Sequence, residues 1–413
     1  MRDWRDLSVW MELAADGAEV LAQAEAALPL GATRASPAVI ARLRRAHDGA
    51  VVAAALELVA ARRKARVKFP QAERLWCDLA GVEQASDARV AAWKAARMRE
   101  VLGEGAEVLD LCCGIGGDAM SIAAAGLAVT AIDLDPRRAW MTERNASCRA
   151  SVADVESFSL AGAALHADPA RRDERAGRRA WTLDDHRPGR AWIERALHES
   201  HAAAIKFSPA VDRRAFGDAP IEWEWIESDG ALVQAVAWSG RFAHLPRGTR
   251  ATAVSRAGAG QSIAGVPDDA RVGRLSADGT LREGAWLGEP ASALERARLL
   301  MEALAVSGAR EVAREIAPGL GLVVVEERPA TPWFEWFRVA AELTGRAEAL
   351  PRLATDLARA QGVAGQLRSV RVRGGAADAD QLTRALGCTP QGRFVLFVWR
   401  EASKARAVLT EAS

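Results

Sequence analysis

The sequence predicts an α/β protein: a Rossmann-like parallel sheet, preceded by a helical N-terminal region and followed by a small α+β domain. Three observations support this prediction. Short apolar segments alternate with helical ones from about residue 105, which is typical of a doubly wound sheet. A Gly-rich turn follows the first apolar segment, in VLDLCCGIGGDA (Val108 to Ala119). Beyond about residue 320, strand-like segments surround one helical stretch.

Composition narrows the class of protein. The chain has 413 residues, half of them hydrophobic, enough for two or three globular domains. Its formal net charge is +1, so nucleic acid could be contacted only through local basic patches. The N-terminus lacks a signal-peptide layout, and no apolar run reaches about 18 residues, so we expect a cytoplasmic protein without a membrane span. The five cysteines suggest neither a disulfide framework nor a metal site; they are Cys77, Cys112, Cys113, Cys148 and Cys388.

The elements are expected in the following order. Residues 1–100 are rich in Ala, Leu, Glu and Arg, with apolar residues at helical spacing, which predicts helices. Ser86 or Asp87 is expected to cap the last of them. Strands and helices then alternate. The expected strands are residues 107–111, 128–133, 151–154, 164–168 and 203–208, and the expected helices are residues 119–126 and 136–146.

The second half of the chain is predicted as follows. Asp229-Gly230 separates two apolar runs, which predicts a β-hairpin. Residues 291–308 are expected to form one helix, and a second helical stretch is expected from about Ala340. Changes in composition divide the chain into four parts. They are an N-terminal helical region (1–100), the sheet domain (101–255), a linker or extension (256–330) and a C-terminal domain (331–413).

The Gly-rich turn fits two cofactors. Gly114, Gly116 and Ala119 match the G-x-G-x-x-G/A pattern of dinucleotide-binding loops, and Asp133 follows Gly114 by 19 residues, near the spacing of a ribose-binding acid. That match alone fits a nicotinamide cofactor. S-adenosylmethionine (SAM) would use the loop differently, because it carries an ammonium and a sulfonium but no pyrophosphate.

Features at successive strand ends favour SAM. An acid at the end of the first strand suits a cationic ligand, and glycines let the backbone approach it closely. The acid after the second strand would accept hydrogen bonds from the ribose hydroxyls, and the acid after the third would accept from the adenine amino group. The expected SAM-binding residues are Asp110, Cys112, Gly114, Gly116, Asp133 and Asp154.

The fourth expected strand ends in HADPARR (His166 to Arg172). Its Asp-Pro resembles the motif that amino-methylating enzymes place beside the methyl group, where a carboxylate orients the target nitrogen and proline fixes the loop. That motif usually ends in an aromatic ring, whereas here alanine and two arginines follow. We expect Asp168 and Pro169 to act at the catalytic centre. Arg171 and Arg172 are expected to bind the substrate by holding phosphates or stacking on bases.

Basic residues cluster in residues 62–68, 171–179 and 368–373. In LRSVRVRGG, strand alternation places Arg371 and Arg373 on the same face. A basic strand of this kind could follow a phosphate backbone, so both arginines are expected substrate contacts. It could equally be the solvent face of a half-buried sheet.

Seven stretches resemble a known family. In order they are VEQASDARVAAWKAARM, VLDLCCGIGGDAMSIAAAG, VTAIDLDPRRAWMTERNA, ADPARRD, IKFSPAVD, GAWLGEPASALERARLL and SVRVRGGAADADQLTRALG. The chain thereby resembles bacterial class I SAM-dependent methyltransferases with a C-terminal THUMP-like domain, and its loop is also similar to that of trimethylguanosine synthases. The resemblance implies a methyltransferase fold and SAM as donor. It also implies RNA, such as tRNA or rRNA, as acceptor, because THUMP domains bind RNA.

The expected activity is an SN2 transfer of a methyl group from SAM to a base nitrogen of structured RNA, a step that needs positioning more than acid–base catalysis. Three alternatives stay open. The acceptor could be a small molecule or a protein, or the chain could be a SAM-binding, RNA-binding module with little catalysis. The third alternative is a nicotinamide oxidoreductase.

Overall fold

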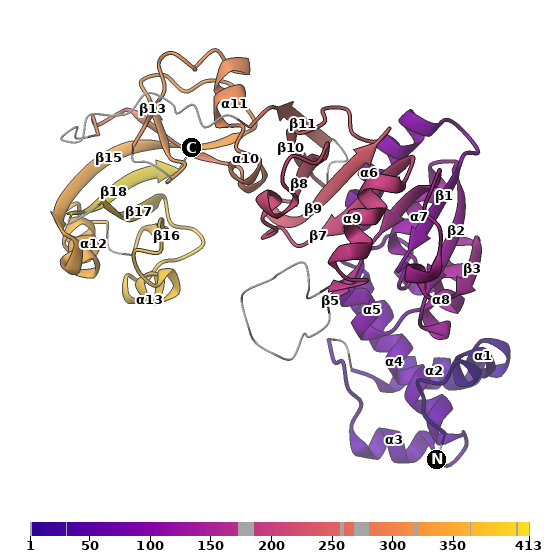
Figure 1. The fold of residues 1–413 in the computed structure, drawn as a ribbon. Coiled ribbons are helices and arrows are strands. Elements are labelled where there is room, and N and C mark those ends of the chain that lie inside the picture. The colour runs from indigo at the N-terminus through magenta and orange to yellow at the C-terminus, as the bar shows by residue number, and fades with distance from the viewer. Residues whose placement is uncertain are drawn as a thin grey trace. The chain divides into compact units, whose positions relative to one another are not determined.

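The protein divides into two compact units, of which the first comprises residues 1–248 and 252–261 and the second residues 249–251 and 262–413. Figure 1 shows the computed structural model. The residues that the structure describes are 2–29, 31–171, 186–256, 260–267, 281–316, 320–363, 365–401 and 404–412.

The N-terminal region is helical, as expected. Aspartates cap its two longest helices: Asp48 accepts from the amides of Ala50 and Val51, and Asp87 accepts from the amide of Arg89, which confirms one of the two expected caps. The helices share a core that continues into Ile115 of the Gly-rich turn. The elements are α1 (Leu7–Asp16), α2 (Ala18–Ala27), α3 (Pro37–Leu43), α4 (Gly49–Ala65), η1 (Ala72–Arg74), α5 (Leu79–Gln84) and α6 (Ala88–Leu102).

A parallel sheet follows, close to the predicted bounds. Its strands are β1 (Glu107–Leu111), β2 (Ala128–Asp133), β3 (Arg149–Val152), β4 (Ala164–Ala167) and β7 (Ala202–Phe207). Its helices are α7 (Gly117–Ala124), α8 (Pro136–Ala146) and α9 (Arg190–Glu199). β1 lies between β2 and β4, so the strand order reverses there and a crevice opens at the carboxyl ends.

Antiparallel strands extend the sheet beyond β7. β8 (Glu222–Ser228) and β9 (Ala231–Gly240) form the predicted hairpin, and Asp229 and Gly230 have φ values of 49° and 78°. Within the first unit the order is β8-β9-β7-β4-β1-β2-β3. Helices α6 and α7 lie side by side and share one core with the sheet (Figure 1). The chain continues through β10 (Thr249–Val254) and β11 (Gly260–Gly265).

The second unit contains a seven-stranded sheet of order β13-β14-β12-β15-β18-β17-β16. Its strands are β12 (Trp286–Pro290), β13 (Arg314–Glu315), β14 (Val323–Val325), β15 (Phe334–Arg346), β16 (Leu367–Val372), β17 (Phe394–Glu401) and β18 (Lys404–Ala412). Its helices are α10 (Ser292–Ala297), α11 (Leu300–Val306), η5 (Ala347–Ala349), α12 (Leu350–Ala360) and α13 (Ala379–Ala385).

The structure differs from the expectation in three places. Residues 291–308 form two helices, because Arg298 adopts a left-handed conformation with φ 58°. The helix expected from Ala340 begins at Leu350, because β15 runs through Ala340 and pairs with β18 despite its Ala- and Glu-rich sequence. The expected linker contains β12, which pairs with β15, so the structure groups residues 262–330 with the C-terminal part.

Candidate functional site

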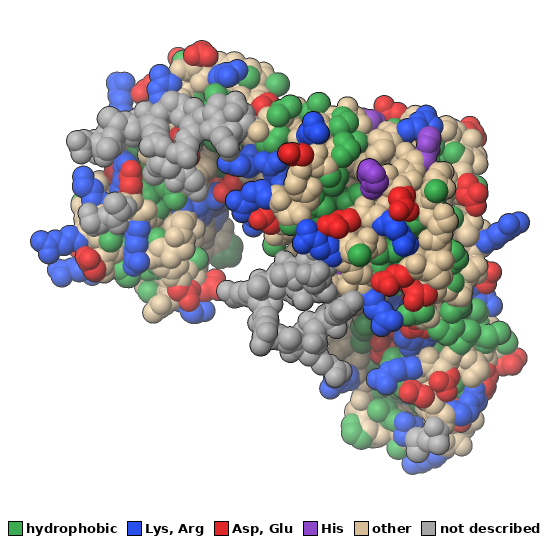
Figure 2. Space-filling view, in the orientation of Figure 1, with side chains coloured by type: hydrophobic (Ala, Val, Ile, Leu, Met, Phe, Trp, Pro, Cys, Tyr) green, Lys and Arg blue, Asp and Glu red, His purple; other side chains and the backbone are tan. Residues whose placement is uncertain are grey.

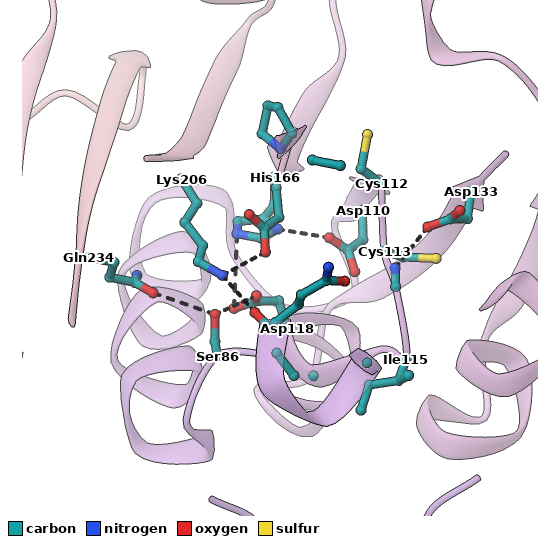
Figure 3. Close-up of a pocket in the computed structure, with 18 of the residues that line it drawn as sticks. Ser86, Asp110, Cys112, Cys113, Ile115, Asp118, Asp133, His166, Lys206 and Gln234 are labelled. Carbon is teal, nitrogen blue, oxygen red and sulfur yellow. Dashed lines mark hydrogen bonds and ion pairs between the residues drawn. The ribbon is translucent and has the colours of Figure 1, made fainter. Parts of the chain in front are cut away.

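A cavity of about 890 Å³ lies in the first unit, where strands β1, β2, β4 and β7 end (Figure 3). Ligands of open α/β sheets bind at this edge, and the volume is near the upper end for small-molecule sites. Among the expected site residues whose side chains the structure describes in this unit, all but Gly116 line it. They are Asp110, Cys112, Gly114, Asp133, Asp154, Asp168 and Pro169.

The loop between β1 and α7 has a left-handed backbone at three positions. Cys112, Gly114 and Gly116 have φ values of 58°, 60° and 82°. A Cβ atom at Gly116 would lie within about 3.1 Å of Thr142, whose hydroxyl donates to the Gly114 carbonyl at 2.9 Å. Gly116 therefore lets the loop lie against α8. A strained non-glycine such as Cys112 is a feature that clusters at functional sites.

Asp133 is held by the loop that it faces. Its Oδ2 accepts from the amide of Gly114 and its Oδ1 from the amide of Asp135, both at 2.9 Å. Burial raises its pKa, and these two bonds oppose that rise. Each carboxylate oxygen can still accept another hydrogen bond, which two neighbouring hydroxyls could supply.

Asp110 is buried at the end of β1 and lacks one hydrogen bond. Its side chain is 1% exposed, and Oδ1 accepts from Nδ1 of His166 at 2.7 Å. Oδ2 has no hydrogen-bond partner among the described residues, although Asp110 lines the cavity. Burial raises the pKa of this carboxyl, and the bond from His166 opposes that. A buried carboxylate with one unpaired oxygen fits a cationic ligand group such as the ammonium of SAM.

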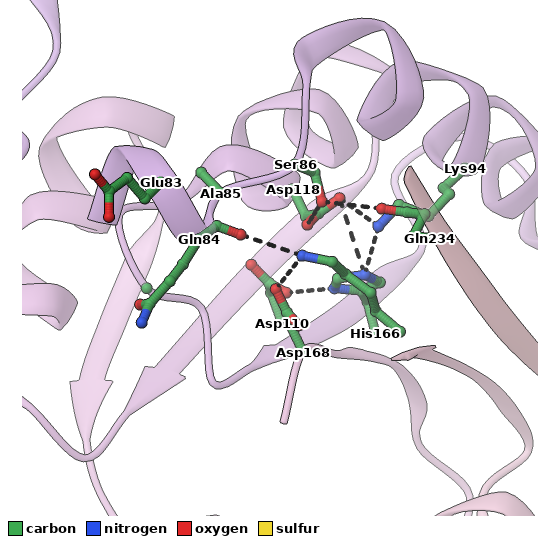
Figure 4. Close-up of polar contacts among 12 residues, drawn as sticks. Glu83, Gln84, Ala85, Ser86, Lys94, Asp110, Asp118, His166, Asp168 and Gln234 are labelled. Carbon is green, nitrogen blue, oxygen red and sulfur yellow. Dashed lines mark hydrogen bonds and ion pairs between the residues drawn. The ribbon is translucent and has the colours of Figure 1, made fainter. Parts of the chain in front are cut away.

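A polar network behind Asp110 was not predicted from the sequence (Figure 4). Nε2 of His166 lies 3.0 Å from Nζ of Lys94, which pairs with Asp118 at 2.6 Å. Because the Lys94 ammonium can only donate, Nε2 accepts and Nδ1 carries the proton given to Asp110. Burial opposes ionisation of Asp118, but Lys94 holds its pKa below the usual range. The network thereby connects α6, α7, β4 and β1.

The Asp118 end of this network continues to two further polar side chains. Ser86 donates to Asp118 at 2.9 Å and lies 3.4 Å from Oε1 of Gln234, on β9. Figure 3 shows Ser86 and Asp118 on the cavity floor, between Gln234 and Asp110. A lysine amid apolar residues in AAWKAA and an acid directly after Gly-Gly were the only sequence signals of this arrangement.

Asp168 pairs with Lys206, the penultimate residue of β7, whose Nζ lies 2.6 Å from Oδ2 of Asp168. Lys206 also donates to the carbonyl of Gln84 at 3.3 Å. The loop after Asp168 continues into β5 (Ala170–Arg171), which pairs with β6 (His186–Arg187). The ion pair fixes the Asp168 carboxylate at the cavity.

Asp154 lies in a more exposed place. It follows β3 and caps the short helix η2 (Val155–Ser157) by accepting from the amide of Glu156 at 2.9 Å. It lines the cavity as well. The cap and a contact with adenine are compatible, since one carboxylate has several acceptor positions.

The thiols of the loop are not nucleophiles. Burial raises the pKa of Cys112 and of Cys113 well above the usual value, which keeps both thiols neutral. Among the described residues, no group of three His, Cys, Asp or Glu side chains could hold a metal ion.

The charge of the cavity favours a cation. Among the residues that the structure describes, ten acidic and six basic side chains line it. Of the basic ones, Arg89 pairs with Asp87 and Asp229, and Lys68 donates to three backbone carbonyls of residues 82–85. An acidic wall suits the ammonium and sulfonium of SAM and opposes the pyrophosphate of a nicotinamide cofactor.

The remaining expected substrate contacts are not among the residues that line the cavity. In the second unit, Arg371 pairs with Glu289 and Glu335, and Arg373 pairs with Glu289 and Glu295. These carboxylates balance the charge of the basic strand. Arg172 and the side chain of Arg171 lie outside the described residues, as does most of the 171–179 cluster.

Internal contacts also occupy the first basic cluster. Arg63 donates to backbone carbonyls of Glu25, Leu28 and Pro29, and Lys64 pairs with Glu83. Figure 2 shows Lys and Arg side chains mixed with Asp and Glu over the face in view.

One family model matches the chain. It describes RNA cap guanine-N2 methyltransferases and matches residues 105–159, the segment from β1 through η2. No curated protein matches.

Solved structures share the fold. A "putative methyltransferase" from Porphyromonas gingivalis W83 has a TM-score of 0.70 at 16% identity, over 96% of this chain and 98% of that one. Two further solved structures resemble only part of this chain, each with a TM-score of 0.29, and no conclusion is drawn from them. A 16S rRNA N2 methyltransferase from T. thermophilus, with SAM and guanosine, is 15% identical over 38% of this chain and 43% of its own. Magnesium protoporphyrin IX methyltransferase from Synechocystis, with SAM, is 11% identical over 37% and 79%.

The fold and the family match confirm two expectations. The chain has the α/β fold of a class I methyltransferase, and its enzyme class is SAM-dependent methyltransferase. No described helix is long and apolar enough to cross a membrane.

Proposed function

We propose that this SAM-dependent methyltransferase methylates a nitrogen of an RNA base. One observation carries the proposal: the Asp168–Lys206 pair lines the same acidic cavity as the cofactor loop. A fixed carboxylate at that place suits an acceptor that carries N–H groups. The match to guanine-N2 methyltransferases over residues 105–159 supports the same chemistry.

The proposed cofactor contacts follow from the geometry. The free Oδ2 of Asp110 accepts from the methionine ammonium, and both oxygens of Asp133 accept from the ribose hydroxyls. Asp154 accepts from the adenine amino group. Gly114 and Gly116 let the backbone approach the cofactor, and Cys112 packs beside it. SAM itself supplies an electrophilic methyl carbon next to its sulfonium.

On the acceptor side, Asp168 accepts an N–H of the target amino group and thereby directs the nitrogen lone pair. Lys206 holds the carboxylate in place, and Pro169 fixes the loop. As the new C–N bond forms, the C–S bond breaks and its electrons go to sulfur. The nitrogen then releases a proton to Asp168 or to water. Positioning accounts for most of the rate in such a step.

The second unit is proposed as a THUMP-like module that presents the RNA. Arg371 and Arg373 are its proposed phosphate contacts, and they would exchange their glutamate partners for phosphates on binding. Arg171 and Arg172 are proposed as further substrate contacts. Affinity for RNA should then fall steeply as salt concentration rises.

The test of the proposed function uses the full chain with methyl-labelled SAM and total RNA, followed by nuclease digestion and mass spectrometry of the nucleosides. Label in a base-methylated nucleoside is expected. Label confined to protein or to small molecules would overturn the RNA assignment.

Asp133→Ala should weaken SAM binding at least tenfold, about 1.4 kcal/mol, because a charged acceptor of two hydroxyls is lost. Titration calorimetry measures the effect. Asp133→Asn keeps the size of the side chain and one acceptor oxygen, so it should lose less. Unchanged affinity in Asp133→Ala would reject the ribose assignment.

Asp168→Ala should lower kcat about 100-fold and leave the Kd for SAM unchanged, because it removes the acceptor that orients the nitrogen. The matched control is Asp212→Ala, whose carboxylate pairs with Arg214 on the surface, away from the cavity. If SAM binding falls together with kcat, Asp168 belongs to the cofactor side instead.

A further inference from the structure

Gln234 and Ser228 are buried polar residues that line the cavity, and the function derived so far uses neither of them. Gln234 is 2% exposed and Ser228 is 8% exposed. Among the described residues, Nε2 of Gln234 and Oγ of Ser228 have no hydrogen-bond partner. An unpaired polar group inside a protein costs about 1–3 kcal/mol, so two such side chains on one cavity wall indicate where a ligand makes hydrogen bonds.

The order of the strands places both residues beyond the Asp168–Lys206 pair. β4 leads to Asp168, and β7 beside it carries Lys206. The next strands outward are β9, which carries Gln234, and β8, which ends at Ser228. β8 runs in the same direction as β7, because both pair antiparallel with β9, so Ser228 lies at the same edge of the sheet as Lys206. Figure 3 shows Gln234 on the side of Lys206 that is away from Asp110.

A bulge in β9 turns Gln234 toward the cavity. The register between β8 and β9 shifts by one residue at Val233, which thereby has no partner on β8. Successive side chains of a regular strand point to opposite faces, whereas Val233 and Gln234 both line the cavity. Bulges re-aim side chains in this way beside active sites.

The carbonyl end of the Gln234 amide faces the cavity floor. Its Oε1 lies 3.4 Å from Oγ of Ser86, which donates to Asp118. This orientation leaves Nε2 as the end of the amide that is available to a ligand. Because the amide is uncharged, Nε2 suits a neutral lone pair, such as that of a carbonyl oxygen or a ring nitrogen.

We propose that Gln234 and Ser228 bind the edge of the acceptor ring that lies away from Asp168. Nε2 of Gln234 donates to a carbonyl oxygen or a ring nitrogen of the acceptor, and the Ser228 hydroxyl makes a second hydrogen bond at that edge. The inference rests on the proposed function. Neighbouring strands lie about 4.8 Å apart, so β4 and β9 are about 10 Å apart, and one flat base can fill the space between the two side chains. An alkyl amine offers no second polar edge, so the acceptor is a heterocyclic amine.

The main experiment measures kcat/KM on RNA and the Kd for SAM with full-length variants. Gln234→Met keeps the length of the side chain but removes both amide atoms, and it should lower kcat/KM about tenfold, equivalent to about 1.4 kcal/mol. Ser228→Ala should lower kcat/KM about threefold, the smaller loss expected from one hydroxyl. The Kd for SAM should be unchanged in both variants.

Ser239→Ala is the matched control for Ser228→Ala. Ser239 lies on β9, is 1% exposed and also lacks a partner for its Oγ among the described residues, but it does not line the cavity. Its loss should leave kcat/KM unchanged. If Ser239→Ala and Ser228→Ala lower kcat/KM equally, the effect is structural and the inference is rejected. Full kcat/KM in Gln234→Met would reject it as well.

Base analogues identify the contact directly. Once the methylated base is known, RNA oligonucleotides present that base with one carbonyl removed or with one ring nitrogen replaced by C–H. One analogue should lower kcat/KM of the original enzyme about tenfold but leave that of Gln234→Met unchanged, because both changes remove the same hydrogen bond. If every analogue lowers kcat/KM equally in the two enzymes, Gln234 does not contact the base and the inference is overturned.

A binding measurement separates this inference from the proposed function. The protein is saturated with S-adenosylhomocysteine, and guanosine, adenosine, cytidine and uridine are titrated by calorimetry. Nucleoside binding that Gln234→Met weakens about tenfold supports the inference even if no RNA is methylated, in which case only the proposed acceptor fails. RNA methylation with a kcat/KM and nucleoside binding indifferent to Gln234 would overturn the inference and leave the proposed function standing. Absence of both nucleoside binding and RNA methylation would overturn both.

Discussion

Replacing Lys94 by methionine is expected to destabilise the protein by about 3–5 kcal/mol, because it leaves the Asp118 carboxylate charged and unpaired in the interior. Lys94 and Asp118 are 1% and 8% exposed. The change also removes the donor to Nε2 of His166. Urea unfolding followed by circular dichroism measures the free energy of unfolding.

The matched control is Lys64→Met. Lys64 pairs with Glu83 on the surface, so its loss should cost about 0–1 kcal/mol. The double variant Lys94→Met with Asp118→Leu should recover part of the loss, since both charges are then gone. Equal destabilisation by Lys94→Met and Lys64→Met would contradict the view that the buried pair holds the site together.

Asp110→Asn should reduce the affinity for SAM by about 2–5 kcal/mol, about 30-fold or more, because an amide replaces the carboxylate that meets the ammonium. The asparagine oxygen can still accept from His166, which limits any effect on folding. Titration calorimetry gives the Kd, and thermal unfolding reports whether the fold is kept.

Glu83→Gln serves as the control for charge alone. Glu83 lines the same cavity but is exposed, so removing its charge should change the Kd by less than about threefold. A loss as large as that in Asp110→Asn would indicate a general field effect, and the specific contact would be rejected.

Local signals were enough to predict much of the fold. The apolar segments and the glycines around β1 and β2 mark strand, turn and helix within a few residues of the observed bounds. Asp-Gly after β8 specifies a hairpin by its own backbone preference. The prediction was wrong where pairing with a distant strand determines the secondary structure. Residues 340–346 have a helical composition, yet they form part of a strand because they pair with β18.

The candidate site shows the same limit. Asp110, Asp133 and Asp168 stand at strand ends, and a strand end is readable from the sequence. The partners of these acids are not: Lys94 is 72 residues from His166, and Ser86 is 148 residues from Gln234. No local sequence pattern predicts that a lysine on a helix is buried beside a histidine at the end of a strand.

The position of Lys94 on α6 has a practical consequence for anyone who wants a minimal enzyme. Trimming the chain to start at residue 101, the first residue of the expected sheet domain, would delete this ammonium together with Ser86. Asp118 and His166 would then face a solvent-filled gap beneath the cofactor loop. The helical segment before the sheet therefore forms part of the cavity. A shorter chain that begins at residue 101 would lose the support of the cavity together with the helices.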